Sequence, residues 1–159
     1  MPSAETQGYR FNHTMIRVKD PKPSLNFYTE ILGMTLIHSS VMSDFTLYFL
    51  GYGEAVDPEG SLDQKNNALV NREGVLELTH NHGTESDPDF AGYASGNSEP
   101  GRGFGHIAIS VPDLEGTCAR LESLGVPFKK KLTEGRMKNV AFALDPDGYW
   151  VEIISHQRF

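Results

Sequence analysis

The chain has one cysteine, Cys118, among 159 residues, so an intrachain disulfide is excluded. A single free thiol fits a reducing compartment. No apolar run of about 18 residues occurs, so the sequence predicts no membrane-spanning helix. The first residues, MPSAETQGYR, lack the apolar core of a secretion signal. Together these absences predict a cytoplasmic protein.

Positive charge is also scarce, with 14 Lys and Arg against 21 Asp and Glu and a net charge of −7. This balance argues against nucleic acid as the main partner. It leaves room for anionic small molecules, because a few cations can gather locally. The hydrophobic content of 38% suits a globular core, and the length favours one domain or two small modules.

The sequence contains two related stretches, HTMIRVKDPKPSLNFYTEILGM from His13 and HIAISVPDLEGTCARLESLGV from His106. Each begins with a histidine on a strand-like run, passes through a turn with Asp and Pro, continues as a helix and ends at Leu-Gly. Each is followed by a strand that carries a glutamate between apolar residues, Glu77 in the first copy and Glu152 in the second. The chain is therefore predicted to be an internal duplication.

Local signals give the order β-α-β-β-β for each copy. The first helix starts at Asp20-Pro21 and stops at Gly33, and the second starts at the N-cap Asp113 and stops at Gly125. The stretch Asp145-Pro146-Asp147-Gly148 predicts a tight turn between two strands. The predicted strands are 11–18, 34–38, 45–50, 75–79, 105–111, 140–144 and 149–155.

The predicted domain organisation is α+β, with one module over 11–79, a linker over 80–104 and a second module over 105–155. From His13 to Glu77 is 64 positions (77 − 13), whereas from His106 to Glu152 is 46 (152 − 106). The surplus of 18 is about the size of the polar segment 51–67, which predicts a loop inserted in the first module.

The two copies together supply two imidazoles and two carboxylates. A lone strand glutamate usually faces solvent, and a lone histidine is usually structural, but matching positions in both copies favour a shared role. Two His and two Glu form a site without thiolate that suits Zn, Ni, Co, Mn or Fe(II). On an octahedral ion they leave two positions free for two neighbouring oxygens of a substrate. A metal bound there would acidify the intervening C–H, and a glutamate would carry the proton.

Other residues give weaker signals. Arg17 shares a strand face with His13, and Arg102 precedes His106. A basic cluster before residue 140 could hold carboxylates or form a solvated loop; it consists of Lys129, Lys130, Lys131, Arg136 and Lys138. Apolar side chains that could line a pocket or pack in the core are Leu47, Phe49, Met137 and Phe142. His80 and His82 could form a rival site with Glu77, while Cys118 lies on an apolar helix stripe and is expected in the core.

At these positions the sequence resembles the glyoxalase I (lactoylglutathione lyase) family of the vicinal oxygen chelate superfamily. The stretches that carry the resemblance include LELTHNHGTE, RGFGHI and DPDGYWVEI. The resemblance as a whole covers about residues 11–154. The resemblance implies paired β-α-β-β-β modules, a homodimer with sites at the subunit interface, and isomerisation of the methylglyoxal–glutathione hemithioacetal to S-D-lactoylglutathione.

The resemblance also implies roles for individual residues. The metal ligands would be His13, Glu77, His106 and Glu152. Glu152 would be the main catalytic base and Glu77 its counterpart. Contacts to glutathione and the substrate pocket would come from Arg17, Asn81, Arg102, Lys130, Arg136 and Met137. The long segments 51–67 and 80–104 resemble the zinc-dependent group, so Zn²⁺ is expected, with Ni²⁺ or Co²⁺ as alternatives, one per active site.

Two other functions remain open from the sequence. An Fe(II) or Mn(II) extradiol-type dioxygenase would use two His and one carboxylate, so the fourth ligand counts against it. A metal-free binding protein of the same fold would not need the four ligands. Metal analysis and an oxygen-uptake assay with catechols separate these alternatives.

Overall fold

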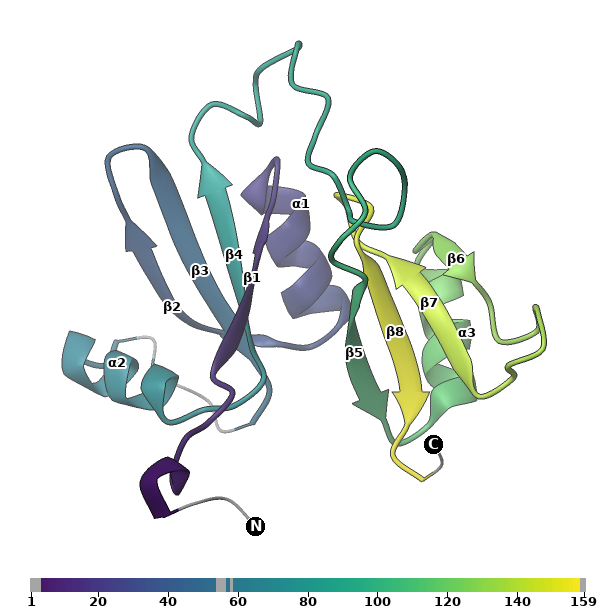
Figure 1. The fold of residues 1–159 in the computed structure, drawn as a ribbon, viewed down its shortest axis with the longest axis horizontal. Helices are drawn as coiled ribbons and strands as arrows, with labels where there is room; N and C mark the ends of the chain where they lie inside the picture. Colours follow the sequence, from purple (N-terminus) through teal and green to yellow (C-terminus); the bar gives the residue numbers. More distant parts are fainter. Residues whose placement is uncertain (1–3, 54–56, 58, 158–159) are drawn as a thin grey trace. The chain divides into compact units, whose positions relative to one another are not determined.

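The computed structural model of the chain describes residues 4–53, 57 and 59–157. The chain divides into two compact units, Met1–Phe90 and Ala91–Phe159. Each unit contains a four-stranded sheet with a helix between its first two strands (Figure 1). The α+β class and the repeated β-α-β-β-β order are thereby confirmed. The division falls inside 80–104, the segment predicted as a linker.

The first unit has strand order β1-β4-β3-β2, with β1 parallel to β4 and the other pairs antiparallel. Its strands are β1 (His13–Arg17), β2 (Thr35–Val41), β3 (Phe45–Gly51) and β4 (Val75–Asn81). Its helical segments are η1 (Ala4–Thr6), α1 (Pro21–Asn26), η2 (Phe27–Ile31) and α2 (Leu62–Val70).

The second unit repeats this arrangement with strand order β5-β8-β7-β6, and β5 is parallel to β8. Its strands are β5 (His106–Val111), β6 (Phe128–Lys130), β7 (Val140–Leu144) and β8 (Trp150–Ser155). Its helix is α3 (Leu114–Ser123). No helix in the described part of the chain is long and apolar enough to cross a membrane.

The predicted helix boundaries are confirmed by their capping bonds. The Asp20 carboxylate accepts from the Lys22 backbone N–H at 2.9 Å, and the Asp113 carboxylate accepts from Gly116 N–H at 3.0 Å. Gly33 and Gly125, which follow the helices, have φ of 77° and 75°, a region where side chains with a Cβ are strained. The first helix differs from the prediction in one respect, because its second half, η2, is a π-helix.

A separate apolar core lies within each unit. Tyr28, Leu50 and Leu78 are fully buried in the first unit, and Leu121, Val151 and Ile153 are fully buried in the second. Burial of each such side chain contributes about 1.5–3 kcal/mol to folding. Successive strand residues point to opposite faces, so burying one face leaves the His and Glu face of each sheet outside the core.

The expectation that 51–67 is a loop is wrong for its end, where α2 (Leu62–Val70) begins. Ser61 and Gln64 form a capping box: the Ser61 hydroxyl accepts from Gln64 N–H, and the Gln64 side chain accepts from Ser61 N–H. None of the α2 residues is buried, so the helix has no apolar stripe for the sequence to reveal. Residues 54–56 and 58 of the predicted loop lie outside the described residues.

The expectation that Lys129 to Lys131 lie in a loop is also wrong in part. Phe128–Lys130 form β6, a short edge strand that pairs antiparallel with β7. Three residues with two lysines show no alternation of apolar and polar side chains, and lysine is common on edge strands. The strand therefore depends on its pairing with β7.

Candidate metal centre

The parallel pairing of β1 with β4 brings together one histidine and one glutamate of the first unit. Met15 is opposite Glu77 in the strand register. His13 lies two residues before Met15, so its side chain is on the same face of the sheet. His13 Nε2 lies 3.2 Å from Glu77 Oε2, and the two side chains are 43% and 12% exposed. We define His13 and Glu77 as the first half-site.

The second unit builds the same pair with the same register. Ala108 is opposite Glu152 on the parallel strands β5 and β8, as Met15 is opposite Glu77 in the first unit. His106 Nε2 lies 3.2 Å from Glu152 Oε2, with side-chain exposures of 41% and 18%. We define His106 and Glu152 as the second half-site. The structure therefore brings together the two pairs that the repeated sequence predicted.

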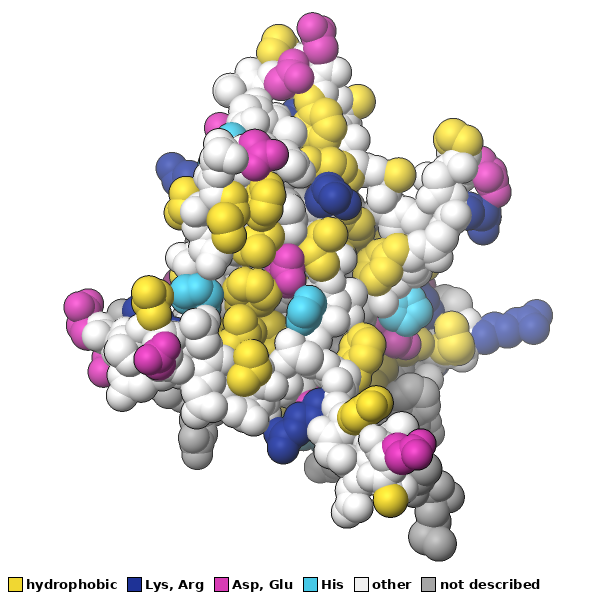
Figure 2. All heavy atoms as spheres, turned by 60° about the vertical axis from the view of Figure 1, so that its left-hand side comes forward, with side chains coloured by type: hydrophobic (Ala, Val, Ile, Leu, Met, Phe, Trp, Pro, Cys, Tyr) yellow, Lys and Arg dark blue, Asp and Glu magenta, His cyan; other side chains and the backbone are white. Residues whose placement is uncertain are grey.

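An aromatic ring supports the histidine in each half-site. Phe49 is opposite Glu77 on β3 and Phe142 is opposite Glu152 on β7. The edge-to-face centroid distances are 6.1 Å for His13 and Phe49 and 5.4 Å for His106 and Phe142. Figure 2 shows hydrophobic side chains gathered on the face that the first unit turns forward, with histidine and acidic side chains among them. Such a face can accommodate a ligand that is partly apolar.

The ligand atoms of each half-site are spaced as neighbours on one metal ion would be. Metal–ligand bonds of about 2.0–2.2 Å place adjacent donors about 2.8–3.1 Å apart in octahedral geometry and about 3.3–3.6 Å apart in tetrahedral geometry. The observed separation is 3.2 Å in both half-sites. A neutral imidazole nitrogen and a carboxylate oxygen suit Zn, Ni or Co. Among the described residues, no three His, Cys, Asp or Glu are grouped to hold a metal, so each half-site offers two ligands.

Asn12, which contacts the first half-site, was not predicted from the sequence. His13 Nδ1 lies 2.7 Å from the side-chain oxygen of Asn12. Asn12 also donates to two backbone carbonyls, those of Leu69 and Arg72. These partners follow Asn12 by 57 and 60 positions, so no local motif could have revealed them.

The predicted substrate contacts of the first unit lie on or near the half-site face. Arg17 is exposed on β1, opposite Thr79, and its side chain makes no hydrogen bond or ion pair with another described residue. Asn81 is the last residue of β4 and is half-buried. In the second unit, Arg102 pairs with Glu99 at 2.7 Å, and both side chains are about 70% exposed. Water screens such a pair, so an anionic ligand can compete for Arg102.

The basic cluster of residues 129–138 differs from its sequence interpretation. The Lys130 ammonium donates to three backbone carbonyls, those of Met137 (2.6 Å), Val140 (2.7 Å) and Lys131 (3.2 Å). An ammonium has three N–H donors, so these bonds occupy all of them. Direct contact between Lys130 and glutathione, as the resemblance implied, would require the ammonium to exchange one of these bonds.

The neighbouring lysines are engaged as well. Lys131 pairs with Glu122 at 2.6 Å, and Lys138 donates to the Thr133 carbonyl at 2.6 Å. Lys129 lies over the Trp150 ring, 5.6 Å from its centroid. Among the described residues, Arg136 is the one cation of the cluster without such a partner, and it is exposed beside exposed Met137. The cluster thus presents one uncommitted cation.

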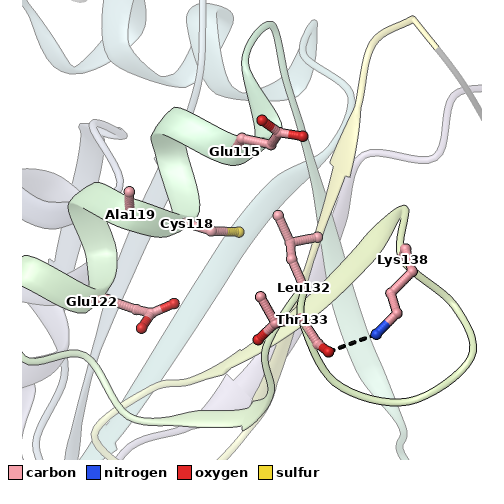
Figure 3. Close-up of a pocket in the computed structure, with 7 residues that line it drawn as sticks. All are labelled: Glu115, Cys118, Ala119, Glu122, Leu132, Thr133 and Lys138. Carbon is pink, nitrogen blue, oxygen red and sulfur yellow. Dashed lines mark hydrogen bonds between the residues drawn. The ribbon is translucent and has the colours of Figure 1, made fainter.

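A cavity of about 540 Å³ separates the segment 131–139 from α3 (Figure 3). Its lining residues are Glu115, Cys118, Ala119, Glu122, Leu132, Thr133 and Lys138. The Lys131–Glu122 pair joins the segment to α3, and the two are not closely packed where the cavity lies. Burial raises the pKa of Cys118 to about 11, which keeps the thiol protonated and supports its predicted core role.

The rival site of His80 and His82 with Glu77 does not form. His80 Nε2 contacts Glu85 Oε2 at 2.7 Å, and His82 Nε2 lies 2.8 Å from Thr46 Oγ1. Residues 77 and 80 are three apart on β4 and point to opposite faces. Hydrogen bonds from its own backbone N–H and from His80 hold the pKa of Glu85 below its usual value.

The comparisons with known proteins agree with this architecture. The family model for the Glyoxalase/Bleomycin resistance protein/Dioxygenase superfamily matches residues 10–153. The chain is 52% identical over 151 residues to a lactoylglutathione lyase of Pseudomonas putida, covering 94% of this chain and 86% of that protein. It is 53% identical over 155 residues to a lactoylglutathione lyase of Pseudomonas aeruginosa, covering 96% and 86%.

A solved structure gives the same result. The trypanothione-dependent glyoxalase I of Leishmania major has a TM-score of 0.68 and 34% identity, covering 94% of this chain and 88% of that one. The matches span the strands that carry both half-sites. On this evidence the chain belongs to the glyoxalase/bleomycin resistance protein/dioxygenase superfamily and is a homologue of lactoylglutathione lyases.

Proposed function

We propose that this chain is a metal-dependent lactoylglutathione lyase that removes methylglyoxal by isomerising its glutathione hemithioacetal to S-D-lactoylglutathione. The observation that carries the proposal is the pair of half-sites, which share register, aromatic support and a 3.2 Å separation of ligand atoms. Lactoylglutathione lyases about half identical over most of the chain support the same reaction.

The four ligands of one metal ion would be His13, Glu77, His106 and Glu152. Each half-site supplies two of them, so a complete centre needs a first and a second half-site. We propose a homodimer in which the first half-site of one protomer meets the second half-site of its partner. The metal is proposed to be Zn²⁺, with Ni²⁺ or Co²⁺ as alternatives, because imidazole and carboxylate ligands accept all three. Cytoplasmic localisation is proposed with this function.

The reaction moves one proton between neighbouring carbons and requires no oxidant or reductant. Glu152 would remove the proton from C1 of the hemithioacetal, and the same carboxyl group would return it to C2. Glu77 would be its counterpart on the other side of the substrate. The metal, when bound, supplies a Lewis acid beside the substrate oxygens and makes the C1–H more acidic. The half-burial of Phe49 and Phe142 beside the carboxylates limits access of water to the transferred proton.

Substrate binding is proposed to rely on exposed polar groups around the half-sites. The guanidinium groups of Arg17 and Arg136 have no hydrogen-bond or ion-pair partner among the described residues and can form charge-assisted bonds with the glutathione carboxylates. Arg102 can exchange its exposed pair with Glu99 for a substrate carboxylate. Asn81 and Met137 complete the proposed pocket. Lys130 is proposed to act indirectly: its hydrogen bonds hold the segment that carries Arg136 and Met137.

The test is formation of the thioester product, followed by ultraviolet absorbance, with the purified protein loaded in turn with Zn²⁺, Ni²⁺ and Co²⁺. We expect chelator to abolish turnover and a divalent ion to restore it. Glu152→Gln should keep the fold and lower turnover by roughly 10²–10⁴-fold, because it removes the proton carrier. Glu115→Gln, an exposed carboxylate on α3, is the control and should leave turnover unchanged. Wild-type turnover in Glu152→Gln would remove Glu152 as the base.

The same preparation separates the rival activities. Oxygen uptake with catechols would indicate a dioxygenase, and protein without metal or turnover would indicate a binding protein. Trypanothione should be assayed beside glutathione, because the Leishmania major relative is described as trypanothione-dependent.

Sharing of the centre between protomers can be tested by mixing two inactive variants. His13→Ala disables every first half-site, and Glu152→Gln disables every second half-site. If the centre spans protomers, a mixed dimer regains one intact site, and an equal mixture recovers about one quarter of wild-type turnover. No recovery after exchange of subunits would place each centre within one chain.

A further inference from the structure

The side chain of Asn12 has only one possible orientation. Its amide nitrogen lies 3.0 Å from the Leu69 carbonyl oxygen and 2.9 Å from the Arg72 carbonyl oxygen. A carbonyl oxygen can only accept hydrogen bonds, so the NH₂ group must face these two atoms. The Asn12 side-chain oxygen is then the atom that faces His13 Nδ1 at 2.7 Å.

This orientation fixes the tautomer of His13. The Asn12 oxygen is an acceptor, so His13 Nδ1 must carry a proton and donate it. In the neutral ring Nε2 then has a free lone pair, and this lone pair lies 3.2 Å from Glu77 Oε2. Two electron-rich atoms at that distance are stabilised by a cation between them. Asn12 therefore prepares the first half-site to bind a metal.

The second half-site provides an internal comparison, because it lacks this device. The residue before His106 is Gly105, which has no side chain, and among the described residues none forms a hydrogen bond with His106 Nδ1. The two half-sites otherwise share their register and their 3.2 Å separation. Asn12 is thus a specific addition to the first of two repeated sites.

The carbonyls that hold Asn12 come from the end of α2, the element inserted in the first unit only. The last carbonyls of a helix lack partners within the helix and need donors from elsewhere. The Asn12 amide donates to the Leu69 carbonyl, which also accepts from Arg72 N–H, and to the Arg72 carbonyl just beyond the helix; Arg10 donates to the Asn71 carbonyl at 2.7 Å. Helix α2 buries none of its own residues, and these bonds attach its C-terminal end to the segment that precedes β1.

We propose that Asn12 is a positioning residue for metal binding, which fixes the tautomer and ring orientation of His13 and couples them to the C-terminal end of α2. The inference rests on the proposed metal centre. Loss of a side chain that orients a metal ligand typically lowers metal affinity by about 10- to 100-fold. The inserted helix thereby supports the first half-site.

Two measurements test this, both independent of turnover. Long-range proton–nitrogen NMR spectra of the metal-free protein report which nitrogen of each histidine carries the proton. We expect His13 to be protonated at Nδ1 in the wild type and to become a mixture of tautomers in Asn12→Ala, while His106 stays unchanged. Zinc affinity, measured by competition with a chromogenic chelator, should fall by about 10- to 100-fold in that variant.

Two further variants separate the effects on His13 from those on the helix. Asn12→Asp keeps an acceptor for His13 but cannot donate to the carbonyls, so it should retain the tautomer while the α2 amides exchange faster. Asn71→Ala removes only bonds between Asn71 and Asn67 within the helix and should leave both the tautomer and zinc affinity unchanged. A thermal melt confirms that each variant is folded.

An unchanged His13 tautomer or wild-type zinc affinity in Asn12→Ala would overturn the inference, as would a loss of the tautomer in Asn12→Asp. Failure of the wild-type protein to bind any divalent metal would instead overturn the proposed function. The two failures are therefore distinguishable.

Discussion

Lys130 provides a test of how the segment 131–139 is held. Replacing it with Met keeps most of the aliphatic side chain and removes the bonds to the Met137, Val140 and Lys131 carbonyls. A hydrogen bond to a charged group contributes about 1.5–3 kcal/mol, but the three bonds share one half-buried ammonium and water partly replaces them. We therefore expect Lys130→Met to lower the free energy of unfolding by about 1–3 kcal/mol.

The cavity under this segment means that little apolar packing can compensate for the lost bonds. Amides of residues 131–139 should exchange faster with solvent in the substrate-free variant. Arg136 and Met137 would then be poorly placed, and KM should rise by roughly 10- to 100-fold, because one displaced charge-assisted contact is worth about 1.4–3 kcal/mol. The effect on kcat should be smaller, since Glu152 lies on β8.

Urea unfolding, hydrogen exchange and steady-state kinetics measure these three effects. The matched control is Lys129→Met, which removes an exposed ammonium over Trp150 and should cost only about 0.5–1 kcal/mol. If Lys130 bound the substrate directly, its replacement by Met would raise KM without changing the stability or the amide exchange of the substrate-free protein. Unchanged stability and unchanged exchange over 131–139 in Lys130→Met would therefore refute the structural role.

Three further outcomes follow from the same structure. Glu85→Gln should lower the free energy of unfolding at neutral pH, where the hydrogen-bonded Glu85 carboxylate is ionised. Because the pKa of Glu85 is lowered, the difference between wild type and variant should shrink in acid, once the wild-type carboxylate is protonated. Equal destabilisation at all pH values in urea unfolding would contradict this. Cys118 should resist iodoacetamide at pH 8 in the folded protein, since a thiol with a pKa of about 11 is roughly one thousandth thiolate there, and rapid native-state alkylation would contradict its burial. Ser61→Ala should cost about 0.5–2 kcal/mol of α2 stability, visible as faster amide exchange in that helix, with little change elsewhere.

Much of the fold is legible in the sequence because the signals are local. Asp20 and Asp113 accept hydrogen bonds from backbone groups two or three residues away, and Gly33 and Gly125 adopt positive φ directly after the helices. These interactions depend on neighbouring residues alone. The helix ends, the strand runs and the repeat could therefore be predicted correctly.

The elements that were mispredicted lack such local signals. Helix α2 buries no residue, and its polar sequence resembles a loop except for the capping box at Ser61. Strand β6 has three residues and is held by pairing with β7. Their formation depends on partners supplied by the rest of the unit.

The candidate site divides in the same way. By itself the sequence determined that each repeat carries one histidine and one glutamate at matching places, because duplication preserves residue type and order. Only the tertiary structure decided that each pair meets at 3.2 Å, that Lys130 is committed to backbone carbonyls, and that Asn12 orients His13. The distances in those contacts are set by strand pairing and by the loops between elements. The order of residues alone does not give such distances.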